Sequence, residues 1–302
     1  MKILLVNPWI YDFAAYDLWM KPLGLLYIAG FLEETGYDVS LINCMDRHHP
    51  DLRKKLGEKL PEDRKYDCGK FFGEEVEKPE PLKNVPRKYR RYGITPDIFE
   101  GELKKISSPG LIGVTPGMTY WYPGAFEVIR QVKSLFPDVP VVLGGVYATL
   151  CHQHAREFSG ADYIIKSRGE LKSLKIADKI AGIKRNYSSA PNKEDELPYP
   201  TYHLISRVKS VSLMSSFGCP FRCSYCASRL LQPIFYQRKS LEIIQEINYF
   251  SHNFGVKDIA FYDDALLVNP ERYIDPILDM IIKRFKNIRF HTPNGLHIRY
   301  ID

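Results

Sequence analysis

The sequence contains no apolar run of the roughly 18 residues that a membrane-spanning helix needs. Its opening stretch, MKILLVNPW, has only four apolar residues between Lys2 and Asn7-Pro8. That is too short for a signal peptide and is typical of a buried first strand. We also find no internal repeat and no low-complexity tract. These absences predict a cytoplasmic protein with no membrane partner, and thiols stay reduced in that compartment.

An excess of charge of one sign is also missing. Lys and Arg number 42 and Asp and Glu 36, which gives a formal net charge of +6. This charge permits an anionic ligand or RNA without requiring either. With 45% hydrophobic and 26% charged residues, the 302-residue chain has the composition of an ordinary globular protein of about two domains.

Short apolar runs alternate with amphipathic stretches in the first 182 residues. The pattern predicts strands at residues 2–6, 39–43, 111–115, 141–145 and 163–166. Uniformly apolar strands separated by helices indicate a parallel sheet covered on both faces. We therefore predict an α/β fold whose first domain, residues 1–182, is a doubly wound, Rossmann-like sheet. Such sheets bind ligands at the carboxyl ends of their strands.

Residues 47–107 interrupt this alternation and exceed an ordinary connection in length, so we predict an inserted lid or docking element. Its basic run RKYRRY, residues 87–92, is interpreted as a solvated amphipathic surface in preference to a phosphate-binding one. Residues 183–209 are polar and proline-bearing and are predicted to be a linker. The strand–helix rhythm then restarts, with strands expected at 210–216, 258–263 and 288–292.

Three cysteines lie within the stretch FGCPFRCSYC, at Cys219, Cys223 and Cys226. Structural zinc takes four ligands, so a zinc site would need a distant fourth one such as His291 or His297. An iron–sulfur cluster of the 4Fe-4S type is held by thiolates and offers four iron positions. Three thiolates would leave one iron open for a substrate or cofactor. The spacing therefore favours a cluster, with these cysteines as metal-binding and catalytic residues.

This cysteine loop, C-x3-C-x2-C with an aromatic residue before the last cysteine, resembles that of the radical S-adenosylmethionine (SAM) enzymes. The resemblance implies a partial (β/α) barrel, an open iron that binds SAM, and one-electron cleavage that yields a 5′-deoxyadenosyl radical. The electron would come from a donor such as flavodoxin or ferredoxin. Asp263 and Asp264 match the stretch that receives the SAM ammonium, although one of them is expected to cap a helix or turn. Tyr225 is expected near the adenine, and Asn294 near SAM or the substrate.

The order of the two domains, with VTPGMTYWYPGAFEVIRQVKSLFPDVPVVLGGVYATL and GADYIIKSRGE in the first, resembles the cobalamin-binding radical SAM proteins along nearly the whole chain. Cobalamin is then expected on the carboxyl edge of the first sheet. The resemblance implies contacts from the loops after the third and fourth strands, at Thr115, Gly117, Met118, Gly144, Gly145 and Val146. Paired glycines let a backbone approach a large flat ligand closely, but they also suit a simple tight turn.

The stretch DRHHPD, residues 46–51, departs from the cobalt-binding pattern D-x-H-x-x-G. Asp51 stands where glycine is needed, and the stretch follows the second strand, not the first. We therefore expect no histidine of the protein on cobalt, and we predict that His48 and His49 are surface residues. Cys44 and Cys151 are expected to be packing residues, and Cys68 to be a structural cysteine or an active-site thiol.

Only three strands follow residue 210, whereas a radical SAM core usually has six strand–helix units. We therefore expect residues 210–302 to form the N-terminal half of such a core, completed by a partner or left as a fragment. The favoured function is a cobalamin-dependent radical SAM enzyme, for example a methyltransferase acting on an unactivated carbon of an unidentified small molecule or peptide. A methylthiotransferase-like RNA-modifying enzyme is an alternative, although nucleic acid is not the expected partner. A non-catalytic module that binds cobalamin or a partner is another.

Overall fold

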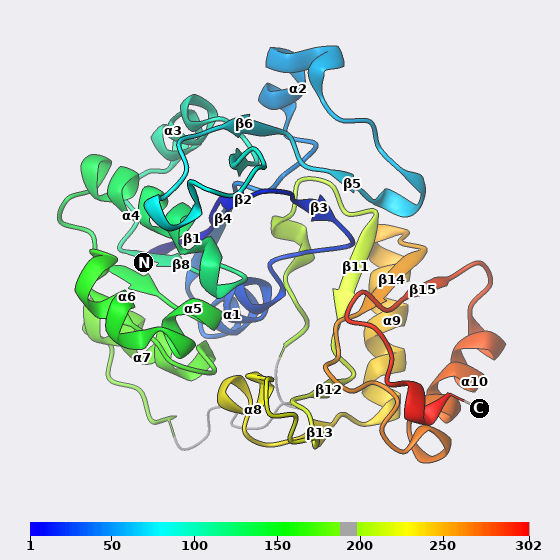
Figure 1. Cartoon of the computed structure of the whole chain (residues 1–302). Helices are drawn as coiled ribbons and strands as arrows, with labels where there is room; N and C mark the ends of the chain where they lie inside the picture. Colours follow the sequence, from blue (N-terminus) through cyan, green and yellow to red (C-terminus); the bar gives the residue numbers. More distant parts are fainter. Residues whose placement is uncertain (188–197, 302) are drawn as a thin grey trace.

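Two parallel β-sheets organise the chain, one in each half of the sequence, in the computed structural model, which describes residues 1–187 and 198–301 (Figure 1). The first sheet has the strand order β10-β9-β8-β1-β4, with every neighbouring pair parallel. All five predicted strands are present. They are β1 (Lys2–Asn7), β4 (Asp38–Asn43), β8 (Leu111–Val114), β9 (Val141–Leu143) and β10 (Tyr163–Ile164). The order reverses at β1 and β8, which makes this the position where such sheets bind ligands.

Alternate residues of these strands face opposite helical layers, as strand geometry requires. Ile3, Leu5 and Leu111 pack against α1 (Leu23–Glu34) and α7 (Glu170–Ala181). Leu4 and Ile112 pack against helices on the other face. Those helices are α3 (Pro96–Lys105), α4 (Tyr122–Leu135), α5 (Gly145–Leu150) and α6 (His152–Phe158). The sheet is therefore buried on both faces, and its carboxyl edge is the part left for ligands.

The predicted insert is less separate from the sheet than its composition suggested. Its last part is α3, whose Ile98, Phe99 and Leu103 belong to the buried core, so α3 is the crossover helix that leads into β8. The insert also contains α2 (Pro50–Leu56). Its strands β6 (Gly73–Glu75) and β7 (Arg90–Tyr92) form an antiparallel sheet with β2 (Ile10–Asp12). The insert is thus joined to the loop that follows β1.

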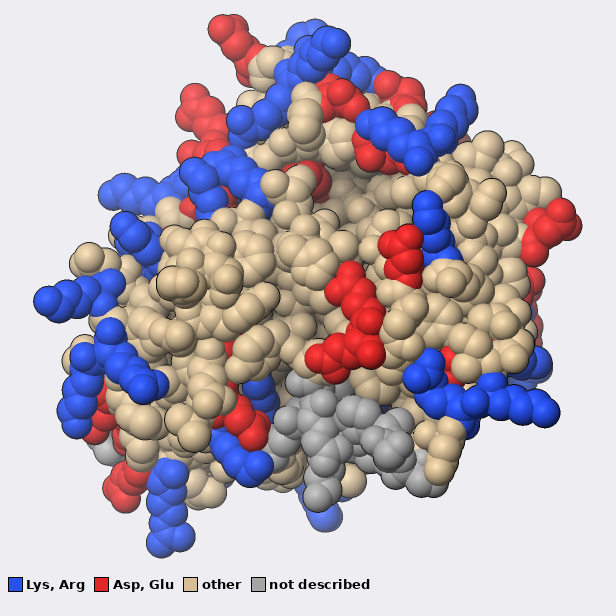
Figure 2. All heavy atoms as spheres, turned by 180° about the vertical axis from the view of Figure 1, so that it is seen from behind, with Lys and Arg blue, Asp and Glu red and all other residues tan. Residues whose placement is uncertain are grey.

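The basic run of the insert, residues 87–92, ends in strand β7 and has one buried and one charged side. Tyr89 and Tyr92 are buried, while Arg91 pairs with Glu74 and Lys88 with Glu75. Seen from behind, Lys and Arg side chains at the top of the molecule stand among Asp and Glu side chains (Figure 2). Charges of both signs are therefore interleaved on this visible face.

The second sheet has the order β11-β14-β15 and is also parallel. Its strands are β11 (Ser210–Leu213), β14 (Asp258–Phe261) and β15 (Arg289–His291), each inside a predicted strand. One face packs on α9 (Ser240–Phe254) and α10 (Ile274–Arg284) through buried aliphatic side chains. Between β11 and α9 lie β12 (Ser216–Phe217), α8 (Ser228–Leu231) and β13 (Tyr236–Gln237), and β12 pairs with β13. Short 3-10 helices lie at Gly57–Lys59, Lys65–Asp67, Glu80–Leu82, Thr119–Trp121, Tyr202–Leu204, Pro270–Arg272 and Ile298–Tyr300.

The other face of the second sheet is polar, and the first half of the chain covers it. The covering segments, residues 16–21 and 63–70, are named the strap here, and they include the strand pair β3 (Tyr16–Asp17) and β5 (Gly69–Lys70). The Trp19 ring stacks on His291 with centroids 3.7 Å apart. The Ser212 hydroxyl donates to the Trp19 carbonyl at 2.6 Å, and Tyr262 donates to the Leu18 carbonyl at 3.0 Å. The strap therefore joins the two sheets.

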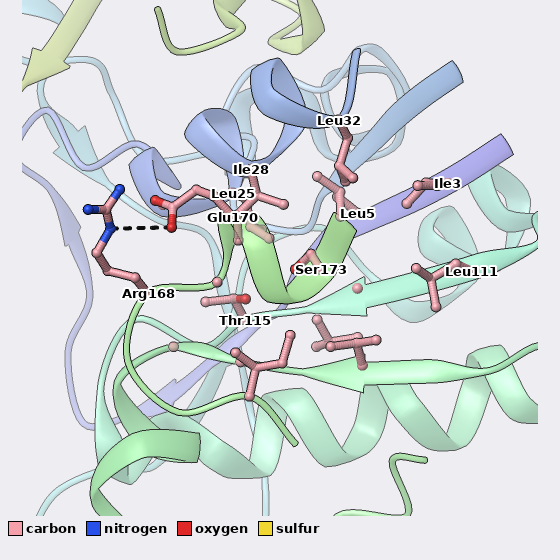
Figure 3. A pocket seen from close by; sticks show the side chains of 18 of the residues that line it. Ile3, Leu5, Leu25, Ile28, Leu32, Leu111, Thr115, Arg168, Glu170 and Ser173 are labelled. Atoms are coloured by element: carbon pink, nitrogen blue, oxygen red, sulfur yellow. Dashed lines mark ion pairs between the residues drawn. The ribbon is translucent and has the colours of Figure 1, made fainter. Parts of the chain in front are cut away.

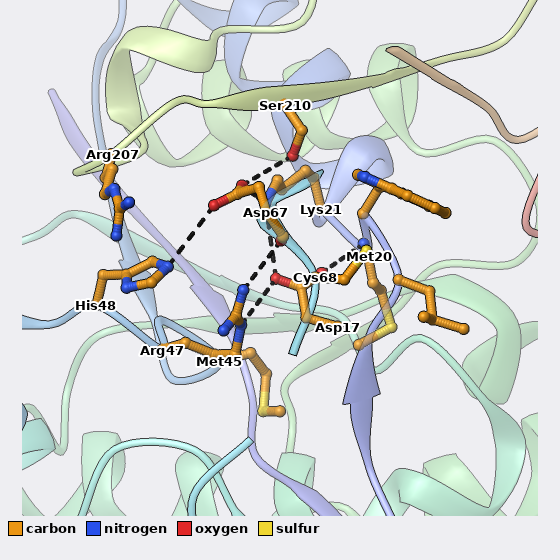
Figure 4. A network of polar contacts seen from close by, with 12 residues as sticks. Asp17, Met20, Lys21, Met45, Arg47, His48, Asp67, Cys68, Arg207 and Ser210 are labelled. Atoms are coloured by element: carbon orange, nitrogen blue, oxygen red, sulfur yellow. Dashed lines mark hydrogen bonds and ion pairs between the residues drawn. The ribbon is translucent and has the colours of Figure 1, made fainter. Parts of the chain in front are cut away.

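A group of buried charges holds the strap in place (Figure 4). Arg47 donates to the Asp17 carboxylate at 3.2 Å and to the Asp67 carbonyl at 3.0 Å. The Lys21 ammonium is 3.8 Å from the carboxylates of both Asp17 and Asp67. The hydroxyl of Ser210, the first residue of β11, donates to Asp67 at 3.0 Å. Asp67 thus connects the insert, the first domain and the second sheet.

The predicted linker begins in a well-defined cluster. The buried Asp178 carboxylate accepts hydrogen bonds from Tyr37, Arg185 and Tyr187. Residues 188–197 of that linker lie outside the described residues, and the domain limits at 182 and 210 stay predictions. None of the described helices has the length and apolar character needed to cross a membrane.

We expect the contribution of Asp67 to stability to disappear in acid. Burial alone would raise the pKa of Asp67, but its contacts with His48, Lys21 and Ser210 outweigh burial and lower that pKa to about 2. Because an unfolded aspartate titrates near pKa 3.9, this carboxylate stabilises the fold above about pH 4, by about 2 kcal/mol, and loses that contribution as the pH falls towards 2. Urea unfolding measured at pH 6 and pH 2.5 checks this.

The Asp67→Asn variant should lack this part of the pH dependence. Asp279→Asn, at an exposed position of α10, serves as the control for removing one carboxylate. Equal pH dependence in the two variants would contradict the role given to Asp67.

Candidate functional site

The three clustered cysteines lie on a loop that runs from β12 to α8. Gly218, directly before Cys219, has φ of +74°, and a Cβ there would stand 2.8 Å from the Ile234 carbonyl oxygen. Only glycine suits such a turn. Cys219 is half-buried, Cys223 and Cys226 are exposed, and the Cys226 N–H donates to the Cys223 carbonyl at 3.1 Å. The loop therefore presents its thiols at the surface of a tight turn.

The spacing of these thiols does not fit zinc. Within residues 1–187 and 198–301, the one group of three ligand atoms lying within 4.8 Å of one another is His49, Asp51 and Glu102. The three cysteine sulfurs therefore do not all lie within 4.8 Å of one another, whereas sulfurs at 2.3 Å from a tetrahedral zinc lie roughly 4 Å from one another. Each thiolate of a 4Fe-4S cluster binds a different iron, so a wider spacing suits the cluster.

The two histidines considered as a fourth zinc ligand have other contacts. His291 is 2.9 Å from the Asp258 carboxylate and lies beneath Trp19. His297 packs on the Phe221 ring with centroids 4.8 Å apart. Neither therefore forms a close metal-binding group with the three thiols.

The protein surrounds the cysteine sulfurs with weak polar contacts. The Ser228 N–H lies 3.5 Å from Cys226 Sγ, and that thiol donates to the Ser228 hydroxyl at 3.3 Å. Burial raises the pKa of Cys219, the backbone N–H of Phe221 opposes this, and the charges of Asp264 and the other two cysteines add to the rise. Metal binding at Cys219 would therefore have to release the thiol proton, because only a thiolate acts as the ligand.

Asp263 and Asp264 follow β14 and have different surroundings. The buried Asp263 carboxylate accepts hydrogen bonds from the N–H groups of Ser215 and Ser216 at 3.1 and 2.5 Å, and from their hydroxyls at 2.7 and 2.6 Å. Burial raises the pKa of Asp264, and a hydrogen bond with Ser228 opposes the rise. Although its surroundings partly desolvate the carboxyl group, the Asp264 residue as a whole is exposed to solvent.

Asn294 lies beside these carboxylates. Its amide donates to the Tyr262 carbonyl at 2.8 Å and the Asp263 carbonyl at 3.4 Å. The structure therefore brings Asn294, Asp264 and the cysteine loop together at the carboxyl end of the second sheet. It gives Asp263 a structural role at the same place. Tyr225 is 91% exposed.

The predicted cobalamin residues gather at the carboxyl edge of the first sheet. Gly145 has φ of +85°, and a Cβ there would be 2.5 Å from Thr115 Cγ2, so the glycine is needed where these two loops meet. Gly117 lies against the Trp121 ring, Val146 is half-buried, and Met118 is 41% exposed. Helix α5 begins at Gly145 and packs against α8, so this edge lies next to the cysteine loop.

A cavity that the sequence did not predict opens at the same edge (Figure 3). It measures about 170 Å³ and lies between the sheet and helices α1 and α7. Thr115, Gly144 and Gly145 line it together with Arg168 and Glu170, whose charged groups are 3.5 Å apart. One residue of the sequence could have indicated this cavity. Gly113 lies inside a strand, and a glycine there marks missing side-chain volume or the close approach of another group.

The surface position predicted for His48 and His49 is wrong. Their side chains are only 11% and 13% exposed. His49 accepts a hydrogen bond from the Asp51 N–H at the start of α2, and its other nitrogen is 3.4 Å from Glu102. Capping of α2 and the contact with Glu102 therefore account for His49. The absence of a protein histidine on cobalt stays a prediction.

The cysteines outside the loop lie in separate surroundings. Cys44 is fully buried in the core of the first domain, Cys68 is buried in the strap, and Cys151 is half-buried between α5 and α6. The packing role expected for Cys44 and Cys151 agrees with these positions. Cys68 has its sulfur 3.8 Å from the Tyr66 carbonyl oxygen.

No family model matches the chain. Among curated proteins, it is 28% identical over 213 residues to an uncharacterized methyltransferase of Pyrococcus horikoshii, a match that covers 61% of this chain and 46% of that protein. Among solved structures it resembles TsrM, a radical SAM methyltransferase from Kitasatospora setae with cobalamin and a 4Fe-4S cluster bound. The TM-score is 0.59, with 18% identity over 94% of this chain and 51% of TsrM.

The chain also resembles OxsB, a cobalamin-dependent SAM radical enzyme solved with aqua-cobalamin. The TM-score is 0.61, with 15% identity over 96% of this chain and 38% of OxsB. The chain thus spans about half the length, or less, of these relatives. The likenesses confirm the expected fold, a doubly wound α/β domain followed by a second α/β unit, as in those two enzymes.

We expect the Asp263→Asn variant to be less stable than the parent by about 2–3 kcal/mol. An amide cannot accept all the hydrogen bonds that the carboxylate accepts, and it turns its own N–H groups towards buried donors. Asp264→Asn, one residue away and exposed, should change the free energy of unfolding by less than about 0.5 kcal/mol. Chemical denaturation of the two variants measures the difference in the free energy of unfolding. Equal stabilities would show that the hydrogen bonds of Asp263 with Ser215 and Ser216 do not stabilise the fold.

Proposed function

We propose that this chain carries the cluster, SAM and cobalamin sites of a radical SAM enzyme, and that the enzyme is a cobalamin-dependent methyltransferase. The observation that carries the proposal is the meeting of two sites. The loop with the three exposed or half-exposed thiols lies at the end of the second sheet. Helix α8, which follows this loop, packs on helix α5 at the glycine-lined edge of the first sheet. The methyltransferases among its relatives, from P. horikoshii and K. setae, support the same function.

Each residue of the second site has a distinct role in this proposal. Cys219, Cys223 and Cys226 hold the cluster as thiolates and leave one iron for SAM. Asp264 pairs with the SAM ammonium, because an exposed carboxylate at the end of a strand is suited to a charge-assisted hydrogen bond. Asn294 is held beside it by the Tyr262 carbonyl and offers its side-chain oxygen. When bound, the cluster supplies the electron that cleaves SAM.

The residues of the first site fit a corrinoid. The glycines at 144 and 145 leave the edge free of bulky side chains, so a large flat ligand can approach the backbone. The exposed Met118 and Tyr120 follow Gly117 and offer apolar surface. The cavity below accommodates a group that projects from the ligand into the domain. Cobalamin, when bound there, would carry the methyl group.

The partners follow from this chemistry. We propose a reducing compartment such as the cytoplasm, a one-electron donor such as flavodoxin or ferredoxin, and a small-molecule or peptide substrate. A methylthiotransferase-like second cluster finds no support, because Cys44 lies in the domain core and Cys68 in the strap.

The test is SAM cleavage under anaerobic conditions. The protein, reconstituted with iron and sulfide and then reduced, should bind about four irons and release 5′-deoxyadenosine from SAM. Cys223→Ala should abolish both, whereas Cys151→Ala should change neither. Asp264→Asn should keep the cluster and raise the SAM concentration needed for half-maximal cleavage about tenfold, because a charge-assisted contact is lost.

Each failure has a separate meaning. Failure to bind a cluster would overturn the role given to the three thiols. A bound cluster with no cleavage of SAM would identify the chain as a binding module. Iron near eight per chain would favour the methylthiotransferase-like alternative.

A further inference from the structure

A second cavity lies in the insert, between α2 and the strap. It measures about 310 Å³, and the polar side chains of its lining are Arg47, His48, Arg53, Asp63 and Lys70. Three of them are cations and one is an anion, so the lining is positively charged even with a neutral histidine. Positive charge gathered in a cavity attracts anions.

Arg47 is held in a fixed orientation at this cavity. Its side chain is only 5% exposed, and it donates to the carboxylates of Asp17 and Asp63 at 3.2 and 2.6 Å. It also donates to the Asp67 carbonyl at 3.0 Å, and Figure 4 shows Arg47 beside Asp17 and Asp67. These bonds use three of the five N–H groups of a guanidinium. Counting partners in residues 1–187 and 198–301, two N–H groups of Arg47 remain for a ligand.

His48 presents a buried donor to the same place. Its Nδ1 is 2.5 Å from the Arg53 guanidinium. A guanidinium only donates hydrogen bonds, so Nδ1 accepts, and the hydrogen of the neutral ring is on Nε2. Nε2 is buried without a hydrogen-bond partner among the described residues, since the Asp63 and Asp67 carboxylates are both 3.8 Å away. A ligand oxygen would remove the cost of this unsatisfied N–H.

The other two cations reach the cavity from different segments. Arg53 belongs to α2 and Lys70 to β5, and in the described part of the chain neither forms an ion pair with a carboxylate. Asp63, the acidic residue of the lining, is already paired with Arg47 and lies 3.9 Å from Arg207. The charges of Arg53 and Lys70 are therefore left for an anion that enters the cavity.

The rest of the lining favours an organic anion. Leu60, Pro61 and Phe72 form an apolar wall beside the cations. An inorganic ion would leave this wall uncovered, whereas an attached organic group would bury apolar surface against it. Cations that approach from three segments suit the tetrahedral oxygens of a phosphate better than a planar carboxylate, which pairs with one guanidinium side by side.

We propose that this cavity binds the phosphate group of a small organic molecule. The site is separate from the proposed reaction site. Asp67, which lies 3.8 Å from His48, is bonded to Ser210, the first residue of β11, whereas the cysteine loop follows the opposite end of that strand. The inference therefore does not rest on the proposed function. A ligand in the cavity would connect α2 with the strap.

The test measures binding of three probes to the full chain by isothermal titration calorimetry at pH 8. They are phenyl phosphate, inorganic phosphate and phenyl sulfate. At this pH a phosphate monoester is a dianion, whereas phenyl sulfate has nearly the same shape and one charge. We expect phenyl phosphate to bind about tenfold more tightly than phenyl sulfate. It should bind at least about threefold more tightly than inorganic phosphate, because its ring covers the apolar wall.

Three variants link this binding to the cavity. Arg53→Gln and Lys70→Gln should each weaken the binding of phenyl phosphate about tenfold, because each removes a charge-assisted contact. Lys54→Gln removes the same charge at the next, exposed position of α2, outside the lining, and should change the affinity by less than about twofold. Urea unfolding of the three variants shows whether the fold is kept.

Each contrary result overturns a defined part of the proposal. Failure of phenyl phosphate to bind would overturn all of it, as would equal losses of affinity in the three variants, which would indicate an effect of general surface charge. Phenyl sulfate binding as tightly as phenyl phosphate would overturn the preference for phosphate. Inorganic phosphate binding as tightly as phenyl phosphate would overturn the organic class of the ligand. The cluster and SAM cleavage are measured separately, so these results leave the proposed function unaffected.

Discussion

The Asp263 carboxylate, buried at the end of β14, accepts hydrogen bonds from the backbone and hydroxyl groups of Ser215 and Ser216. Those serines stand between β11 and the cysteine loop, so this one side chain fixes where the loop leaves the sheet. The Tyr273 hydroxyl donates to the Ser215 carbonyl and holds the same point from the direction of α10. The turn at Gly218 and the placement of the three thiols follow from that fixed start. A carboxylate that resembles a ligand-binding group by its position is here part of the framework, and its exposed neighbour Asp264 is the residue to which the proposed function assigns the contact with SAM.

The two sheets present their ligand-binding edges to each other because two contacts hold the halves of the chain together. One is the packing of α5 on α8, which places the glycine-lined edge beside the cysteine loop. The other is the strap, which covers the polar face of the second sheet and keeps Asp67 bonded to Ser210. A group bound at one edge therefore has the other edge as its neighbour. Under the proposed function, this arrangement would bring two cofactors to one substrate.

Most of the strand framework could be predicted from the sequence, because buried parallel strands are continuous apolar runs and the helices between them are amphipathic. The cysteine loop could be predicted as well, since its spacing is local. Features built from distant residues could not. The sequence pattern placed helix α3 in the charged insert, because it is rich in charged residues. Only the apolar stripe around Phe99 indicates that this helix belongs to the core. The cavity depends on how α1 and α7 meet the sheet at Gly113. The low exposure of the His48 side chain and the four hydrogen bonds accepted by Asp263 both depend on distant residues, so the local sequence pattern does not predict them.

The strap also bears on how the chain is made. Its hydrogen bonds to the second half of the chain join residues 143 to 244 positions apart, from Ser210 with Asp67 to Tyr262 with Leu18. Contacts of such long range form late, because the loop between them must close first. Chains emerge from the ribosome amino end first, and domains fold as units in that order. Trp19, Tyr66 and Asp67 hold positive φ angles in the strap, a local cost that the later partners offset. During synthesis, the first domain thus forms before the second sheet, which then folds against it.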